Sequence, residues 1–276
     1  MTDLRLRLPG ADGTLTEYRL SGDEPIAPPP RPPRGRVAIA AAHVVADPWA
    51  AADPAVETSI DWDATLAWRR HLWGCGLGVA EAMDTAQRGM GLDWPNSLTL
   101  IQRAVAEAKA VGGEIACGAG TDQLLPAATV DLDAVIAAYA EQFEAVEAAG
   151  GRIVMMASRA LARCASGPDD YARVYGELLR QAREPVILHW LGEAFDPALA
   201  GYWGSADLAA AAAVLVDVIA DNADAVDGVK VSVLDAGVEI DVRRRLPQGV
   251  RCYTGDDYNF PDLIAGDEHG HSDALL

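Results

Sequence analysis

Short, nearly continuous hydrophobic runs alternate along this chain with longer segments whose apolar residues recur at helical spacing. Eight hydrophobic runs are predicted strands: residues 37–41, 77–83, 114–118, 152–156, 185–190, 228–233, 250–254 and a last one beginning within 270–276. Predicted helices occupy the main segments between them: residues 59–73, 97–111, 132–149, 169–182 and 207–222. Strands that are apolar on both faces belong to a parallel sheet covered by helices, and eight such repeats predict a (β/α)₈ TIM barrel.

The first 35 residues follow a different pattern. Leucine alternates with arginine over residues 4–8, a Gly- and Pro-containing turn follows, and residues 14–20 alternate again. We therefore predict an N-terminal β-hairpin extension over residues 1–23, a Pro-rich linker over 24–35 and the barrel over 36–276. No helical segment follows the eighth strand, so we expect a barrel truncated after strand eight and a longer native product.

An open doubly wound sheet is the alternative α/β architecture. Its nucleotide-binding form carries a Gly-x-Gly-x-x-Gly turn after the first strand, and this chain has none there. The isolated pair Gly118 and Gly120 is more typical of a turn. The barrel is the better prediction.

The chain is strongly acidic, with a formal net charge of -19. Such a surface repels nucleic acid and anionic membranes, so we expect neither as a partner. The sequence shows no signal peptide and no apolar run long enough to span a membrane. Its four cysteines are far apart and lack metal-ligand spacing, which favours buried free thiols in a reducing cytoplasm and no bound cofactor.

Lysine usage points to a candidate nucleophile. Only two of the positive residues are lysine, and one of them, Lys230, lies inside the apolar run 228–233. A desolvated lysine loses its proton and attacks a carbonyl carbon to form a Schiff base, which arginine does not do. The alternative is a structural ion pair between Lys230 and Asp235 or Asp256, and the sequence alone leaves both readings open.

Polar side chains at the carboxyl ends of the predicted strands supply the other candidates, because barrel active sites gather at that face. His189 lies one strand before Lys230 and is the candidate acid and base near neutral pH. Asp84 and Arg159 could bind substrate hydroxyls and a carboxylate, respectively. The full set of candidate substrate-binding residues is Glu81, Asp84, Thr85, Arg159, Glu193, Asp256 and Asp257.

Four segments in this order resemble the dihydrodipicolinate synthase and N-acetylneuraminate lyase superfamily of lysine aldolases. Residues 77–87 lie where that family has its strand-two Gly-Thr-Thr-Gly-Glu, and residues 185–190 resemble its Pro-x-x-Leu-Tyr-Asn. Gly228-Val229-Lys230 resembles its Gly-Ile-Lys, and residues 254–257 resemble its Ser-Gly-Asp-Asp. The resemblance spans residues 36–276 and is that of a divergent dihydrodipicolinate synthase-like branch. It implies a Schiff-base lyase or aldolase that assembles as a homodimer or homotetramer.

The departures from the family pattern concern the substrate. Asp84-Thr85 replaces the threonine pair that binds the keto-acid carboxylate, and His189 replaces the proton-relay tyrosine. Arg159-Ala160 lies near the place of a strand-four tyrosine pair, and Glu193-Ala194 replaces an arginine. An aspartate repels a carboxylate, so a keto sugar or sugar-acid derivative is a better prediction than plain pyruvate.

Two other functions remain open at this point. A divalent metal held by His189, Glu193, His269 and His271 could polarise a sugar carbonyl in an isomerase or a metal-dependent aldolase. A barrel that has lost its substrate-binding residues could instead be a non-catalytic sensor or scaffold.

Overall fold

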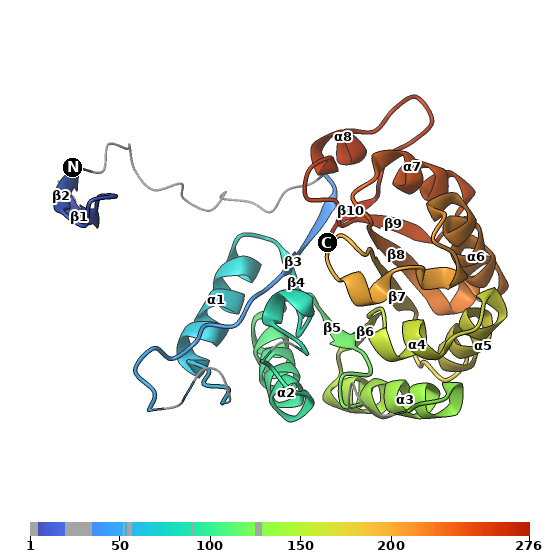
Figure 1. Ribbon diagram of the computed structural model, residues 1–276, viewed down its shortest axis with the longest axis horizontal. Helices are drawn as coiled ribbons and strands as arrows, with labels where there is room; N and C mark the ends of the chain where they lie inside the picture. Colours follow the sequence, from blue (N-terminus) through green and yellow to red (C-terminus); the bar gives the residue numbers. More distant parts are fainter. Residues whose placement is uncertain (1–4, 20–34, 52, 54–56, 90, 125–128) are drawn as a thin grey trace.

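The computed structural model describes residues 5–19, 35–51, 53, 57–89, 91–124 and 129–276. Eight parallel strands close into a barrel in the order in which they occur along the chain, and Figure 1 shows helices arranged around them. The strands are β3 (Val37–Ala41), β4 (Gly78–Glu81), β5 (Ile115–Ala119), β6 (Arg152–Met155), β7 (Val186–Leu191), β8 (Val226–Ser232), β9 (Arg251–Thr254) and β10 (Ala274–Leu275). β10 pairs with both β9 and β3 and so closes the circle, which confirms the predicted TIM barrel.

Helices follow seven of these strands. They are α1 (Trp62–Gly74), α2 (Trp94–Val111), α3 (Leu132–Ala149), α4 (Arg159–Cys164), α5 (Pro168–Leu179), α6 (Leu208–Asp221), α7 (Ala236–Arg245) and α8 (Phe260–Ala265). The described residues also form four short 3₁₀ turns: η1 (Asp84–Ala86), η2 (Pro197–Leu199), η3 (Tyr202–Gly204) and η4 (Ala223–Ala225). The helix predicted from residue 97 begins at Trp94, because Asp93 caps it by accepting the backbone N–H of Asn96.

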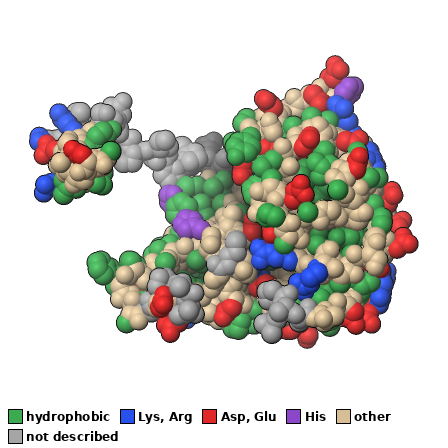
Figure 2. Space-filling model, in the orientation of Figure 1, with side chains coloured by type: hydrophobic (Ala, Val, Ile, Leu, Met, Phe, Trp, Pro, Cys, Tyr) green, Lys and Arg blue, Asp and Glu red, His purple; other side chains and the backbone are tan. Residues whose placement is uncertain are grey.

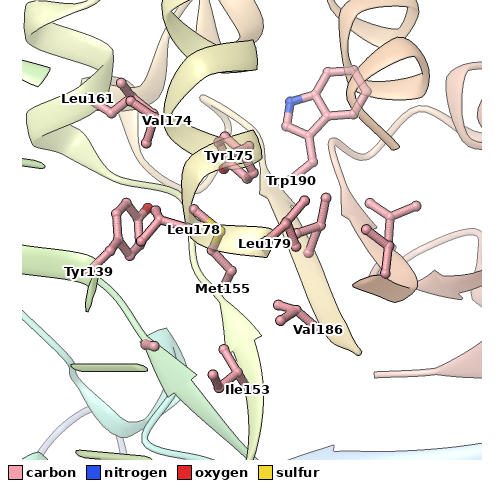
Figure 3. Close-up of a cluster of buried hydrophobic side chains, with 14 of the residues drawn as sticks. Tyr139, Ile153, Met155, Leu161, Val174, Tyr175, Leu178, Leu179, Val186 and Trp190 are labelled. Atoms are coloured by element: carbon pink, nitrogen blue, oxygen red, sulfur yellow. The ribbon is translucent and has the colours of Figure 1, made fainter. Parts of the chain in front are cut away.

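The larger core lies between the barrel and its helices. Figure 3 shows part of it, where side chains from β6 and β7 meet those of α3, α4 and α5. Met155 and Trp190 are among its buried members, and Tyr139, Leu178 and Val186 pack in the same cluster. Because side chains alternate between the faces of a strand, the remaining strand positions point into the barrel.

The barrel interior is filled mainly by small and branched residues. Ala80, Ala116, Val154, Ile187 and Tyr253 form one buried cluster there. Gly118 has no room for a side chain, since an added Cβ would lie 2.5 Å from the carbonyl oxygen of Ala82. This packing fills the barrel interior, and active sites of this fold lie at the carboxyl ends of the strands.

The predicted N-terminal hairpin is confirmed: β1 (Arg5–Pro9) and β2 (Leu15–Arg19) pair antiparallel with each other and with no strand of the barrel. Most of the predicted Pro-rich linker lies outside the described residues. Figure 2 shows acidic side chains distributed over the visible face of the barrel, not gathered in one patch. None of the helices in the described ranges combines the length and the hydrophobicity that a membrane span requires.

The cysteine prediction holds only in part. All four cysteines are free, and Cys117 and Cys252 are buried as expected. Cys75 and Cys164 are partly exposed, contrary to the prediction. Cys75 lies at the C-terminal end of α1, near His71.

Candidate active site

Neighbouring strands place His189 and Lys230 side by side in the barrel. His189 on β7 is paired in register with Lys230 on β8. The valines on either side of Lys230 belong to the outer core, so the lysine itself points into the barrel. Both residues are buried, with exposed fractions of 1% for His189 and 6% for Lys230. The structure therefore brings the candidate nucleophile and the candidate acid and base together, as the sequence predicts.

Burial determines the protonation of both groups. Desolvation lowers the pKa of Lys230, and the negative charges of Asp84 and then Asp257 partly oppose that shift. Desolvation also lowers the pKa of His189 well below its usual range, and the nearby positive charge of Lys230 adds to the shift. His189 is thus a neutral imidazole near neutral pH, and Lys230 loses its proton more readily than an ordinary lysine.

The ion-pair alternative for Lys230 finds no support in its proposed partners. The Asp235 carboxylate caps α7 by accepting the backbone N–H of Val238. Asp256 accepts hydrogen bonds from the backbone of Tyr258 and Asn259. Within the described part of the chain, Lys230 forms no salt bridge. A lysine that is buried without a salt bridge fits the role of a nucleophile better than that of a structural cation.

Ser232 is a member of the site that the sequence prediction missed. Its hydroxyl lies 3.2 Å from Nε2 of His189, and the residue is buried. It follows Lys230 by two positions on β8, so both side chains point to the same face of the strand. The spacing of two residues from Lys230 is the feature of the sequence that could have predicted Ser232 as a member of the site. The hydrogen bond fixes the orientation of the imidazole ring, as second partners of functional histidines do.

Gly255 allows Lys230 and Ser232 to pack at this point. A Cβ added at Gly255 would lie 2.1 Å from the Ser232 hydroxyl oxygen and 2.7 Å from Cε of Lys230. The glycine follows β9 directly, and its N–H donates to the carbonyl of Val231. The observed position of Lys230 therefore requires that residue 255, just after the neighbouring strand β9, has no side chain.

Gly255→Ala is expected to displace Lys230 and Ser232 and to lower activity more than tenfold, because misplacing a reacting group by about 1 Å has effects of about a hundredfold. The overpacking destabilises the fold by about 1–3 kcal/mol. Activity and thermal unfolding would be measured together. Gly74→Ala is the control, since no atom lies within 4 Å of its added Cβ. Full activity of Gly255→Ala would contradict this role.

A cavity of about 680 Å³ opens beside these residues at the carboxyl ends of the strands. Both His189 and Asp84 line it. Asp84 Oδ1 is buried and has no hydrogen-bond partner among the described residues. A buried carboxylate oxygen without a partner is costly, so a donor on a bound molecule is its natural complement. Asp84 also acts on the charge of Lys230, which places this end of the cavity next to the amine.

A hydrogen-bonded network that the sequence prediction missed forms the cavity floor. Arg88 donates two hydrogen bonds to Asp122, at 2.7 and 3.2 Å, and others to the carbonyls of Ala82 and Gly118. Gln142 on α3 contacts both Arg88 and Asp122. Because the guanidinium is already satisfied by these partners, Arg88 acts as a brace that holds the ends of β4 and β5 together.

Two candidate substrate-binding residues have structural partners instead. Glu81 lies in a buried ion pair with Arg69 of α1, and it does not line the cavity. The side chain points away from the barrel interior, because it alternates with the inward-facing Ala80. Asp256 is occupied by the three hydrogen bonds that Tyr258 and Asn259 donate. The assignment of Glu81 and Asp256 to substrate binding is therefore wrong, because both carboxylates are held by structural partners.

The other candidates divide by exposure. Arg159 lines the cavity, where it forms an ion pair with Asp196 at 2.5 Å. Thr85 and Glu193 are exposed and do not line the cavity. Asp257 is also exposed, although its charge still acts on Lys230. The structure thus places Asp84, His189 and Arg159 around the cavity. Lys230 is not part of the cavity lining, but it lies beside His189 and within reach of the charge of Asp84.

The predicted metal ligands are not assembled. His189 is buried on β7, whereas Glu193, His269 and His271 are exposed. His269 contacts Glu268, and His271 lies near the backbone carbonyl of Ser272. In the described ranges of the chain, no three His, Cys, Asp or Glu side chains form a group that could hold a metal ion. This donor set therefore does not support the metal-dependent alternative.

Solved structures of a dihydrodipicolinate synthase, of an aldolase and of a further protein of the dihydrodipicolinic acid synthase family have the same fold. The chain matches dihydrodipicolinate synthase from Bacillus anthracis with a TM-score of 0.62 and 12% identity, covering 89% of this chain and 70% of that one. It matches 2-keto 3-deoxygluconate aldolase from Picrophilus torridus with a TM-score of 0.59 and 14% identity, covering 87% and 73%. A prophage protein of the dihydrodipicolinic acid synthase family from E. coli, solved in complex with pyruvate, gives a TM-score of 0.64 and 12% identity over 87% and 69%. At these identities the likeness establishes a shared fold.

Sequence comparison places the chain in a family. No curated protein matches it. A family model described as "Protein of unknown function (DUF993)" matches residues 6–276, which include the whole barrel. The chain therefore belongs to the DUF993 family.

Proposed function

We propose that this protein is a class I aldolase-type lyase that forms an imine between Lys230 and a carbonyl substrate. The observation that carries the proposal is the buried Lys230, without a salt bridge to any described residue, beside the neutral His189 at the carboxyl ends of the barrel strands. A neutral amine in a dry pocket is the requirement of Schiff-base catalysis. The shared fold of lysine aldolases supports the same assignment.

The proposed reaction begins when Nζ of Lys230 attacks the carbonyl carbon and the resulting carbinolamine loses water to give an iminium ion. His189 then takes the proton from a hydroxyl on the β-carbon. The bond between the α- and β-carbons breaks, its electron pair moves to the iminium to form an enamine, and the β-carbon leaves as an aldehyde. Protonation of the enamine and hydrolysis of the imine release a ketone and restore the amine.

Asp84 supports a hydroxylated substrate over a simple keto acid. Its unpartnered buried oxygen is suited to accept a hydrogen bond from a substrate hydroxyl, and its charge disfavours a carboxylate next to the carbonyl. The keto-sugar hypothesis rests on Asp84 alone, since Glu193 and Asp256 lie outside the cavity. We propose a β-hydroxy carbonyl compound as the substrate class and, from the resemblance, a homodimer or homotetramer as the active form.

Borohydride reduction with mass mapping tests the proposal. Incubation with a panel of hydroxy ketones, keto sugars and pyruvate, followed by reduction, is expected to leave one adduct on Lys230. The map is simple to read because the chain has one other lysine, Lys109, which donates to the carbonyl of Ala149. A folded protein that gives no adduct with any carbonyl would refute the imine mechanism.

The rate of imine trapping is expected to increase with pH through a midpoint below the ordinary lysine value of 10.5, because burial lowers the pKa of Lys230. Asp84→Asn removes the charge that favours the ammonium form and is expected to move the midpoint to lower pH still. Asp196→Asn is the control, since this carboxylate lines the same cavity but does not shift Lys230. A midpoint that moves upward in Asp84→Asn would contradict the assignment.

A further inference from the structure

The cavity beside Lys230 has two chemically different sides. Asp84, His189 and the Arg88–Asp122 network form its polar floor. The side formed by α4, η2, the end of β7 and the loops after β5 and β7 carries several apolar side chains, and we call these side chains the apolar wall. The apolar wall consists of Leu124, Ala160, Ala162, Leu191, Phe195 and Leu199.

The cavity is larger than a small keto acid requires for binding. At about 680 Å³ it lies in the range of about 300–1,000 Å³ that suits drug-sized ligands. Among the charged residues at this side, Arg159 and Asp196 form an ion pair at 2.5 Å, and Arg163 of α4 also lines the cavity. The wall therefore offers a bound molecule mainly apolar contacts, and hydroxyl groups placed against it would lose hydrogen bonds to water without replacement.

We propose that the apolar wall is a subsite for an apolar substituent, a ring or a short alkyl chain, on the half of the substrate that leaves as the aldehyde. This inference rests on the proposed imine chemistry, which fixes the ketone half at Lys230. Asp84 and His189 then face the β-hydroxyl, and the chain beyond the β-carbon extends toward the wall. The substrate class is a β-hydroxy ketone with a polar head and an apolar arm.

Among the residues of the apolar wall, Phe195 is expected to lose the most solvent-exposed surface when a ligand binds. Its side chain lines the cavity and is 41% exposed, so its ring still contacts water in this structure. Covering an exposed aromatic ring with an apolar group is favourable in proportion to the area removed from water. Phe195 thus determines specificity without being part of the floor that carries the chemistry.

A matched pair of aldols tests the subsite. 4-Hydroxy-4-phenylbutan-2-one would be cleaved to benzaldehyde and acetone, and 4-hydroxypentan-2-one, which has a methyl in place of the phenyl, to acetaldehyde and acetone. We expect kcat/KM to be at least about tenfold higher for the phenyl compound. Phe195→Ala is expected to reduce that preference about fivefold or more.

Phe260→Ala is the matched control, because Phe260 has a similar exposure of 39% and does not line the cavity. Ala162→Trp, which narrows the subsite, is a second variant that is expected to abolish the preference should Phe195→Ala fail to fold. Binding of 4-phenylbutan-2-ol, which forms no imine, is measured separately by calorimetry on the wild-type protein and Lys230→Met.

The outcomes separate the two proposals. Equal rates for both aldols, with an adduct on Lys230, would overturn the apolar subsite and leave the imine mechanism intact. Binding of the phenyl alcohol that Phe195→Ala weakens, with no adduct from any ketone, would support the subsite and refute the imine mechanism. No binding of the phenyl alcohol and no phenyl preference in a folded protein would overturn the subsite.

Discussion

Replacing Lys230 by methionine is expected to abolish the borohydride-trapped adduct and to lower kcat/KM by about a thousandfold or more, because no other described amine reaches the barrel interior. Methionine is similar in length and apolar, so it fits the buried position without a charge to desolvate. The thermal midpoint is expected to stay the same or to rise. Loss of activity would then report chemistry and not unfolding.

Lys109→Met is the control for this experiment. Lys109 lies at the exposed end of α2, and its removal is expected to leave activity and the adduct on Lys230 unchanged. The ion-pair reading of Lys230 predicts the opposite pattern for Lys230→Met, with a lower thermal midpoint and retained turnover. Measuring both quantities on both variants distinguishes the two readings, and a Lys230→Met protein that still turns over would end the proposal.

The barrel could be predicted from sequence because its signal is repeated. Each strand is a short apolar run and most helices have a clear period, so individual boundary errors do not change the topology. The start of α2 shows the limit of that approach. The helix begins at Trp94, three residues before the prediction, because the capping by Asp93 and the proline in the first turn determine its start and the apolar period does not.

The site was predictable where chemistry and strand position agree. Lys230 and His189 are polar residues within apolar strands, and neighbouring parallel strands bring such positions together. Ser232 and Gly255 were missed because their roles lie in contacts across strands, the first through a hydrogen bond and the second through an absent side chain. Sequence spacing reports which face a residue occupies, but it does not report which atom a neighbouring strand places opposite.

Carboxylates were the least predictable part of the site. An acidic residue after a strand binds substrate, caps a helix or pairs with a buried cation, and its residue type is the same in each case. Asp84 has a buried oxygen without a described partner, whereas Asp256 is saturated by hydrogen bonds from the next turn. Only the positions of the hydrogen-bond donors around each carboxylate distinguish Asp84 from Asp256, and the sequence does not give those positions. Glu81 is the exception, because the alternation along β4 already placed it on the outer face.

Breaking the buried ion pair between Arg69 and Glu81 is expected to destabilise the fold by about 3–5 kcal/mol, because it leaves a charge in the core without its partner. Both side chains have an exposed fraction of 0%, and two hydrogen bonds of 2.8 Å join the guanidinium to the carboxylate. Arg69 also donates to the carbonyl of His43, after β3, and Glu81 accepts the N–H of Ala82. The pair therefore joins α1 to the ends of β3 and β4, near the site.

Glu81→Gln is the variant to measure, since glutamine keeps the size of the side chain and removes its charge. About 3–5 kcal/mol corresponds to a thermal midpoint lower by about 10 °C in a protein of this size. Arg70→Met is the control from the same helix, because Arg70 pairs with Glu107 on the surface, with exposed fractions of 44% and 30%. Such a pair contributes about 0–1 kcal/mol. Equal thermal midpoints for the two variants would show that the buried pair does not stabilise the barrel. Substrate binding by Glu81, which the ion pair argues against, would then again be a candidate role.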